Sequence, residues 1–170
     1  MKVAVFGAGT MGSGIAQVFA AKGHTALMYA SSVASAQKHK DKLAASLAKR
    51  VAKGKMTEEE KTAAMNNIKV TCTADSVADY ADCDLIVEAA LEVFEIKSDI
   101  FKRLDEVCKE STIIASNTSS ISMTSLAAAT SRPDRVVGLH FFSPVPVMSL
   151  VEIVYGLRTS QETIDMVTEV

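Results

Sequence analysis

The sequence predicts an α/β domain in which helices cover both faces of a doubly wound, mostly parallel sheet. Three observations lead to this fold class. Short apolar runs alternate along the chain with longer segments of helical periodicity, which is the order of elements in such a sheet. The first run is continuously apolar, as in a strand that is buried on both faces. A length of 170 residues is enough for one sizeable domain with its own core.

The first half of the chain predicts three strands and three helices. The strands are Lys2–Phe6, Thr25–Tyr29 and Ile68–Cys72. The first helix follows Gly7 and stops at Gly23, and the second is a long helix from Val33 to Lys53. Thr57, with Glu60 three residues later, forms a capping box that begins a short third helix.

The second half of the chain continues the same alternation. Its strands are Asp84–Ala89, Thr112–Ser116, Val136–Phe141 and Leu150–Val154. A helix from about Val93 to Cys108 carries one apolar face, and Thr159–Glu162 opens a final helix. The sequence ends inside that helix, so we expect residues 1–170 to form a single domain that is truncated in its last helix.

Composition limits the classes of function. Hydrophobic residues make up 48% and charged residues 22% of the chain, which is the balance of a globular protein. A net charge of -2 gives no general attraction to nucleic acid. No apolar run approaches the roughly 20 residues of a membrane span, and no signal peptide follows Met1. We therefore expect a cytoplasmic protein without nucleic-acid or membrane partners.

The three cysteines predict neither a disulfide framework nor a metal site. Cys72, Cys83 and Cys108 are odd in number and widely spaced. Cysteines in such a pattern are mostly buried or idle thiols. A reducing compartment such as the cytosol is their simplest setting.

A glycine-rich turn is the first candidate binding site. Its residues are Gly7, Ala8, Gly9, Thr10, Met11 and Gly12. The turn lies directly after the first strand and opens the first helix, which is the context that dinucleotide binding requires. Gly7 permits the tight turn, Gly9 lets the backbone approach a pyrophosphate, and Gly12 lets the helix pack close to the strand. The sequence therefore predicts a Rossmann-type dinucleotide-binding domain, with the helix N-terminus facing the phosphates.

The end of the second strand departs from the usual fingerprint. Such domains usually carry an acid here that binds the adenosine ribose, whereas this chain has Ala30, followed by Ser31 and Ser32. A carboxylate would repel the 2′-phosphate of NADP, so Ala30 removes that barrier. Both serines can donate to a hydroxyl or to a phosphate, and the pattern leaves NAD and NADP open.

Polar residues follow the later strands at the edge where open α/β sheets bind their ligands. Ser119 lies in the segment Ser116–Ser120 after one strand, His140 ends the next strand, and Glu152 follows in the last. A histidine serves as a general base near neutral pH, and a carboxylate partner orients its ring. Each residue taken alone has an ordinary structural explanation, so the pattern indicates an active site without fixing the reaction.

Taken together, these segments resemble the 3-hydroxyacyl-CoA dehydrogenase family, and most closely its bacterial 3-hydroxybutyryl-CoA dehydrogenases. The resemblance covers essentially the whole chain, and its carriers are Val5–Gln17, Ala115–Ser120, His140–Met148 and Leu150–Glu152. It implies an oxidoreductase of fatty-acid and butanoate metabolism. NAD or NADP would exchange a hydride with an (S)-3-hydroxyacyl-CoA, such as 3-hydroxybutyryl-CoA, and give a 3-ketoacyl-CoA, such as acetoacetyl-CoA.

The same resemblance implies roles for individual residues. His140 would take the hydroxyl proton, Glu152 would pair with His140, and Ser119 would hydrogen-bond the reacting oxygen region. The positions that match cofactor contacts, beside the glycine turn, are Ala30, Ser31, Glu92, Lys97, Ser119 and Ser143. The positions that match contacts to coenzyme A are Ser46, Lys53 and Ser119.

Three departures from the family pattern bear on function. Ala30 replaces the ribose-binding acid and leaves the preference between NAD and NADP open. Ser143 replaces an asparagine at a cofactor-contact position and is shorter. The helical C-terminal domain of the family, which carries a further catalytic asparagine and the main dimer contacts, is absent from these residues. We expect the full-length protein to be a homodimer through that domain, and the isolated chain to turn over weakly or not at all.

The long second helix gives the coenzyme A assignment independent support. Four of its residues fall within about 60° of one another around the helix. They are Lys42, Ser46, Lys49 and Lys53, and we call them the basic stripe. This stripe suits the phosphate charges of coenzyme A, whereas a solvated helix face is the alternative explanation.

Two further functions compete with an enzyme. The chain could be a nucleotide-binding fragment without turnover, or a structural protein on the same scaffold, like the lens crystallin that resembles this family. Ser119, His140 and Glu152 are all present, and a purely structural role would not require that set. Turnover of acetoacetyl-CoA with each reduced cofactor separates these functions.

Overall fold

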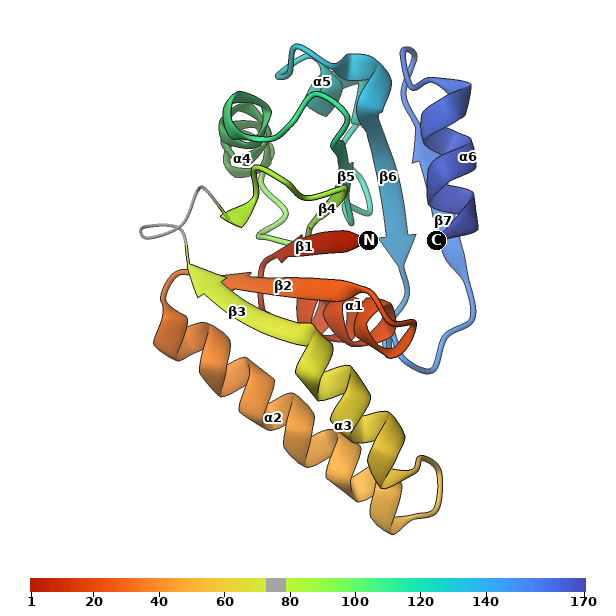
Figure 1. Cartoon of the computed structure of the whole chain (residues 1–170). Helices are drawn as coiled ribbons and strands as arrows, with labels where there is room; N and C mark the ends of the chain where they lie inside the picture. The colour runs from red at the N-terminus through yellow and green to blue at the C-terminus, as the bar shows by residue number, and fades with distance from the viewer. Residues whose placement is uncertain (73–78) are drawn as a thin grey trace.

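The computed structural model describes residues 1–72 and 79–170, and it contains a seven-stranded sheet with helices on both faces (Figure 1). The strands are β1 (Lys2–Phe6), β2 (Thr25–Ala30), β3 (Ile68–Cys72), β4 (Leu85–Glu88), β5 (Ile113–Ser116), β6 (Val136–Phe141) and β7 (Val151–Tyr155). Their order across the sheet is β3-β2-β1-β4-β5-β6-β7. The pairs from β3 to β6 are parallel, and β7 runs antiparallel to β6. The predicted doubly wound, mostly parallel sheet is confirmed.

The helices of the described residues are α1 (Thr10–Ala21), α2 (Val33–Ala52), α3 (Glu58–Asn67), α4 (Phe94–Val107), α5 (Met123–Ala127) and α6 (Gln161–Glu169), with a 3₁₀ turn at Pro133–Arg135. The expected elements all form, and their ends differ from expectation by at most two residues. The sequence did not predict α5 or the 3₁₀ turn, because elements this short do not display helical periodicity. Within the described ranges, no helix has the length and apolar character needed to cross a membrane.

Burial on both faces explains the apolar composition of β1. Val3 and Val5 pack in one core cluster with Ile15 of α1, whereas Phe6 packs in the opposite cluster with Phe101 of α4. Successive side chains of a strand point to opposite faces. A strand that helices cover on both sides therefore needs apolar residues at nearly every position.

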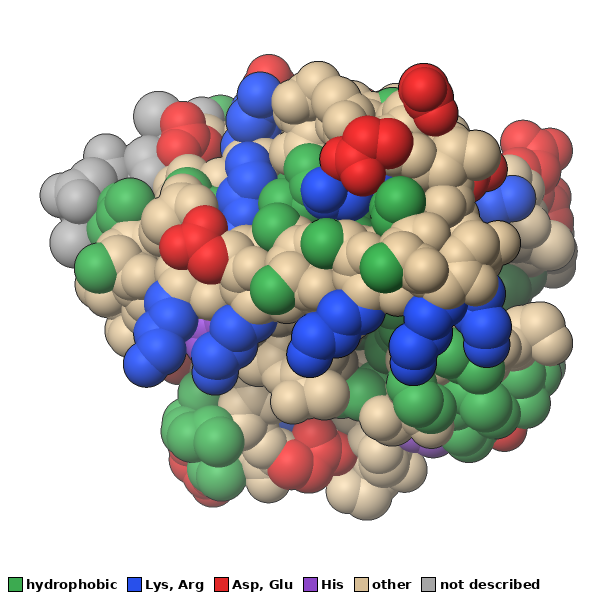
Figure 2. All heavy atoms as spheres, turned by 90° about the horizontal axis from the view of Figure 1, so that it is seen from below, with side chains coloured by type: hydrophobic (Ala, Val, Ile, Leu, Met, Phe, Trp, Pro, Cys, Tyr) green, Lys and Arg blue, Asp and Glu red, His purple; other side chains and the backbone are tan. Residues whose placement is uncertain are grey.

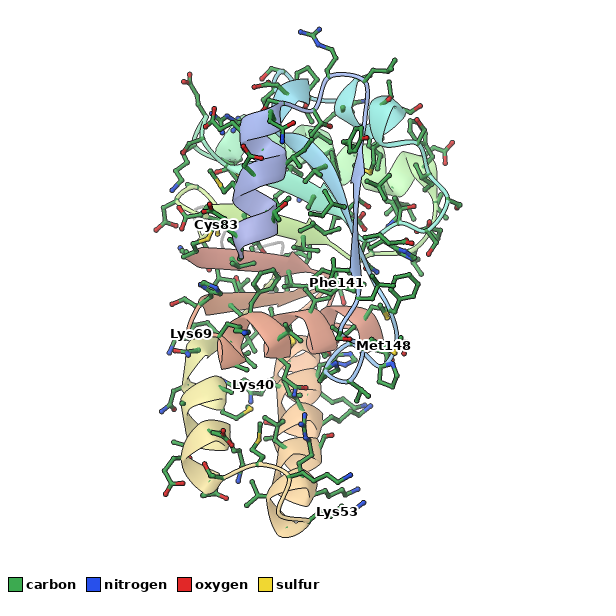
Figure 3. All side chains as sticks on the ribbon, turned by 90° about the vertical axis from the view of Figure 1, so that its right-hand side faces the viewer. Lys40, Lys53, Lys69, Cys83, Phe141 and Met148 are labelled. Carbon is green, nitrogen blue, oxygen red and sulfur yellow. The ribbon has the colours of Figure 1, made fainter. Side chains whose placement is uncertain are left out.

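The helices α2 and α3 lie side by side and extend away from the sheet as a two-helix arm (Figure 1). Leu43 and Leu47 on one side of α2 are buried, and the predicted capping box of Thr57 and Glu60 begins α3. Lys53 is the C-cap of α2 and lies at the far tip of the arm (Figure 3). The opposite, charged side of α2 is therefore exposed along the whole arm.

The ends of the parallel strands meet along one edge of the sheet, which we call the carboxyl edge. Phe6 of β1 is in register with Glu88 of β4, Glu88 with Ser116 of β5, and Ser116 with Gly138 of β6. The strand order reverses between β1 and β4, and doubly wound sheets bind their ligands at such a switch point. The register thus brings the glycine turn and the polar segments after the later strands to the same edge.

Candidate active site

The glycine turn holds the N-terminus of α1 tightly against the end of β1. Gly7 has a φ of 122°, in the left-handed region, and its N–H donates to the Tyr29 carbonyl oxygen at 3.1 Å. A Cβ on Gly12 would lie 1.6 Å from the carbonyl oxygen of Gly7. Both positions therefore require glycine, for the turn and for the close approach of the helix that the sequence predicts.

The space in front of the α1 N-terminus fits a pyrophosphate. Gly9 is the N-cap residue of α1 and is exposed, and a Cβ on it would have no described atom beyond its chain neighbours within 4 Å. The first turn of α1 contains no acidic side chain. Since the first N–H groups of a helix have no intrahelical acceptor, they and the helix dipole favour an anion here.

The end of β2 offers a small, uncharged surface beside the glycine turn. Ala30 is nearly buried, and Ser31 is exposed. Ser32 is the N-cap of α2, and its hydroxyl accepts a hydrogen bond from the N–H of Ser35 at 3.1 Å. Of the two serines, Ser31 is therefore the one without a capping role.

Ser119, His140 and Glu152 form a hydrogen-bonded chain at the other end of the carboxyl edge. His140 of β6 and Glu152 of β7 face each other in the antiparallel register, and Nδ1 of His140 lies 2.8 Å from Oε2 of Glu152. The Ser119 hydroxyl lies 3.1 Å from Nε2 of His140. His140 thus contacts both Ser119 and Glu152, the two residues that were predicted with it as active-site candidates.

This arrangement is suited to proton transfer at Nε2 of His140. The Glu152 carboxylate accepts from Nδ1–H and so leaves the Nε2 lone pair directed toward Ser119. Ser119, His140 and Glu152 line an open hollow of about 390 Å³, which Tyr155 of β7 also borders. A substrate hydroxyl in that hollow has both a base and a hydrogen-bonding hydroxyl within reach.

Asn117 ties the Ser119 segment to β6. Its side-chain oxygen accepts a hydrogen bond from the N–H of Phe141 at 2.8 Å, and its own N–H donates to the Glu88 carbonyl oxygen at 2.8 Å. These bonds fix the segment between β4 and β6. Asn117 had no predicted role, although it stands directly after a buried strand, where a polar residue indicates an edge contact.

Glu92 lies beneath the same segment. Its Oε1 accepts from the N–H of Ser119 at 3.0 Å and from the hydroxyls of Thr118 and Ser120. Its side chain is 43% exposed, and Oε2 lies 3.3 Å from the ammonium of Lys97. Glu92 therefore lies at the boundary between the solvent at the carboxyl edge and the buried ammonium of Lys97.

Several opposing effects set the pKa of Glu92. Burial raises it, but the hydrogen bond from Thr118, the charge of Lys97 and the amide of Ser119 outweigh burial and lower the pKa below its usual value. The bonds to ionised Glu92 thus favour the folded state at neutral pH. That contribution is lost only as the pH falls through the lowered pKa.

The structure places Lys97 in the interior rather than on the surface. Its side chain is 1% exposed, and its ammonium lies 2.7 and 2.9 Å from the two carboxylate oxygens of Glu88, which is fully buried. The resemblance implied that Lys97 contacts the cofactor. In the structure, the ion pair with Glu92 connects Lys97 to the carboxyl edge. Glu88 had no predicted role, although an acid that ends an otherwise apolar strand was a visible signal.

The basic stripe follows the exposed side of the two-helix arm. Lys42, Ser46, Lys49 and Lys53 are all exposed, and Figure 2 shows a row of basic side chains on the face of the molecule that contains α2. Lys42 also lines a hollow of about 300 Å³ with Thr10 of the glycine turn and Ser143. The stripe therefore runs from the cofactor turn toward the tip of the arm. Among the described residues, no three histidine, cysteine or acidic side chains are grouped to hold a metal ion.

Comparison with known sequences gives a specific match. The family model described as 3-hydroxyacyl-CoA dehydrogenase, NAD binding domain, matches residues 2–170. The chain is 47% identical over 169 residues to a 3-hydroxybutyryl-CoA dehydrogenase of Clostridioides difficile, and 44% identical over 169 residues to a 3-hydroxyadipyl-CoA dehydrogenase of Escherichia coli. The two alignments cover 99% and 98% of this chain, but 59% and 34% of the relatives.

Solved structures agree with the sequence comparison. The crystal structure of the (S)-3-hydroxybutyryl-CoA dehydrogenase of Ralstonia eutropha matches this fold with a TM-score of 0.94 at 46% identity. The match covers 99% of this chain and 58% of that one. The chain therefore spans less than two thirds of the length of each of these three relatives.

Replacing Gly9 by valine should abolish NADH binding and leave the fold intact. A Cβ at Gly9 meets no described atom within 4 Å beyond its chain neighbours, and the valine methyl groups fill the space for the pyrophosphate. We expect the dissociation constant for NADH, measured by fluorescence titration, to rise at least about 100-fold, or about 2.7 kcal/mol. The melting temperature should stay close to that of the wild type.

Gly12→Ala is the matched control, because its Cβ collides with the Gly7 carbonyl oxygen inside the fold. It should lower the melting temperature, in contrast to Gly9→Val. Wild-type NADH affinity in Gly9→Val would contradict the assignment of the turn.

Proposed function

The chain belongs to the 3-hydroxyacyl-CoA dehydrogenase family and matches its NAD-binding domain, and we propose that the protein oxidises (S)-3-hydroxyacyl-CoA substrates with NAD. The proposed substrate is 3-hydroxybutyryl-CoA and the product acetoacetyl-CoA, with the protein acting in the cytoplasm as a homodimer. The observation that carries the proposal is the contact of Ser119, His140 and Glu152 on the same sheet edge as the glycine turn. The relatives at 47% and 46% identity support the choice of substrate by their names.

His140 acts as the base in this proposal. Its Nε2 takes the proton of the substrate 3-hydroxyl group, while the Glu152 carboxylate at Nδ1 stabilises the imidazolium that results. Ser119 donates a hydrogen bond to the substrate oxygen and keeps it beside Nε2. Bound NAD supplies the acceptor for the hydride that leaves C3. Reduction of the ketone follows the same path in reverse, with the proton returning from His140.

The basic stripe supplies the contacts to coenzyme A. Coenzyme A is an extended molecule with several phosphate charges, and Lys42, Lys49 and Lys53 present positive charge along the exposed side of the arm. Lys42 stands beside the hollow that Ser143 and the glycine turn border, whereas Lys53 lies at the tip (Figure 3). We propose that the acyl end enters the hollow at His140, and that Ser46 and Lys53 contact the nucleotide end.

In the full-length protein, replacing His140 by glutamine should lower the turnover of acetoacetyl-CoA by about 100-fold or more, as expected for the loss of a general base. NADH affinity should change much less than turnover, because the glycine turn that binds the pyrophosphate is intact. Glu152→Gln should also lower turnover, since an amide cannot stabilise the imidazolium as a carboxylate does. The measurement is the loss of NADH absorbance, with the exposed residue Glu110→Gln as the control. Full activity in either His140→Gln or Glu152→Gln removes the pair from the mechanism.

Replacing Ala30 by aspartate should shift cofactor preference toward NADH. A carboxylate at the end of β2 repels the 2′-phosphate of NADPH and accepts hydrogen bonds from the ribose of NADH. We expect the ratio of NADPH to NADH dissociation constants to rise by about tenfold or more. Ala34→Asp, on the exposed first turn of α2, controls for added charge nearby. An unchanged ratio in Ala30→Asp would show that Ala30 does not face the ribose.

A further inference from the structure

Glu88 and Lys97 form a buried ion pair behind the candidate active site. Glu88 is fully buried, Lys97 is 1% exposed, and the ammonium of Lys97 contacts both carboxylate oxygens of Glu88. Oε2 of Glu88 also accepts from the hydroxyl of Ser116 at 2.6 Å, and Oε1 accepts from the N–H of Ala90 at 2.5 Å. Donors thus surround the Glu88 carboxylate, and it joins α4 to β5 and to the turn after β4.

The same ammonium reaches the active-site segment through a second carboxylate. Lys97 lies 3.3 Å from Oε2 of Glu92, and Oε1 of Glu92 accepts the N–H of Ser119. The hydroxyl of Ser119 in turn contacts Nε2 of His140. An unbroken series of contacts therefore runs from the interior pair to the proposed base.

The donors of Lys97 are already occupied in this arrangement. Its ammonium has three N–H bonds, and its acceptors are the Glu88 carboxylate, the Glu92 carboxylate and, at 3.4 Å, the Ala90 carbonyl oxygen. Its side chain is 1% exposed, so these acceptors surround almost all of it. Its effect on the active site passes through Glu92.

We propose that Lys97, held by Glu88, is a positioning residue that fixes Glu92 and thereby places Ser119 against His140. A shift of about 1 Å in a positioned group is enough to cost about 100-fold in rate, so a buried anchor behind a surface loop has a large effect on chemistry. The proposal rests on the proposed function in taking Ser119 and His140 as catalytic. It adds that their contact depends on a charge that is buried behind the active-site segment.

The imidazole ¹⁵N signals of histidine report the contact directly, without turnover. The chain has three histidines, so selective labelling gives three imidazoles, and His140→Gln identifies the signals of His140. Ser119→Ala gives the Nε2 shift of His140 when the serine contact is lost. Lys97→Met should move the Nε2 signal from its wild-type position toward that of Ser119→Ala. Lys102→Met, on the exposed side of the same helix, should leave it unchanged.

Two further variants keep the test decisive. Lys97→Met leaves Glu88 without its counter-charge, so the double variant Glu88→Gln/Lys97→Met removes both buried charges and is the better-tolerated form. Glu92→Ala acts near the surface and should move the Nε2 signal in the same direction. A wild-type Nε2 signal in a folded Lys97 variant overturns the proposal, and so does failure of both Lys97 variants to fold, which would make the pair a stability element.

The outcome separates this inference from the proposed function. If the full-length protein does not turn over acetoacetyl-CoA but Lys97→Met still moves the His140 signal, the reaction is wrong and the positioning role holds. If turnover is confirmed and the signal does not move, the reaction stands and the positioning role is wrong. In the active full-length protein, Lys97→Met should also lower kcat by about tenfold to 100-fold.

Discussion

The burial of Glu88 is the interaction on which the carboxyl edge depends. Its carboxylate lies at the end of the central strand β4 without contact to water, where a charge is costly unless donors surround it. Lys97, Ser116 and the N–H of Ala90 supply those donors. Loss of one member of such a pair costs about 3–5 kcal/mol in typical proteins. The pair therefore holds α4, β5 and the turn after β4 in one fixed arrangement.

Two functional ends lie on opposite sides of this anchor. On the β1 side, the contact of Gly12 with the Gly7 carbonyl fixes the N-terminus of α1, which faces outward with its N–H groups. On the β6 side, antiparallel register places Glu152 beside His140. Because parallel register aligns the strand ends, an extended dinucleotide on this edge has its phosphates at one end and its reacting ring near the other. Sheet geometry, rather than any single loop, sets the distance between them.

Local sequence signals predicted most of the fold, because apolar runs, glycine turns and capping boxes act over a few residues. The glycine turn and the partners Ser119, His140 and Glu152 could be named for the same reason, with help from the family resemblance. The Glu88–Lys97 pair could not be predicted, since a lysine on an amphipathic helix normally indicates an exposed side. The burial of Lys97 depends on how α4 packs against the end of β4, which is a contact between elements. The contact between Asn117 and Phe141 depends likewise on the neighbouring strand.

The most direct test of the whole account is to map the amide shifts of the ¹⁵N-labelled chain during titration with NADH. We expect concentrated changes at Gly7–Gly12 and, in the same titration, at Ser119 and His140, because one bound dinucleotide spans the carboxyl edge. Amides of the distant α6 (Gln161–Glu169) should not shift. Absence of change at Gly7–Gly12, or changes there without any at Ser119 and His140, would contradict the claim that this edge is one continuous cofactor and active site.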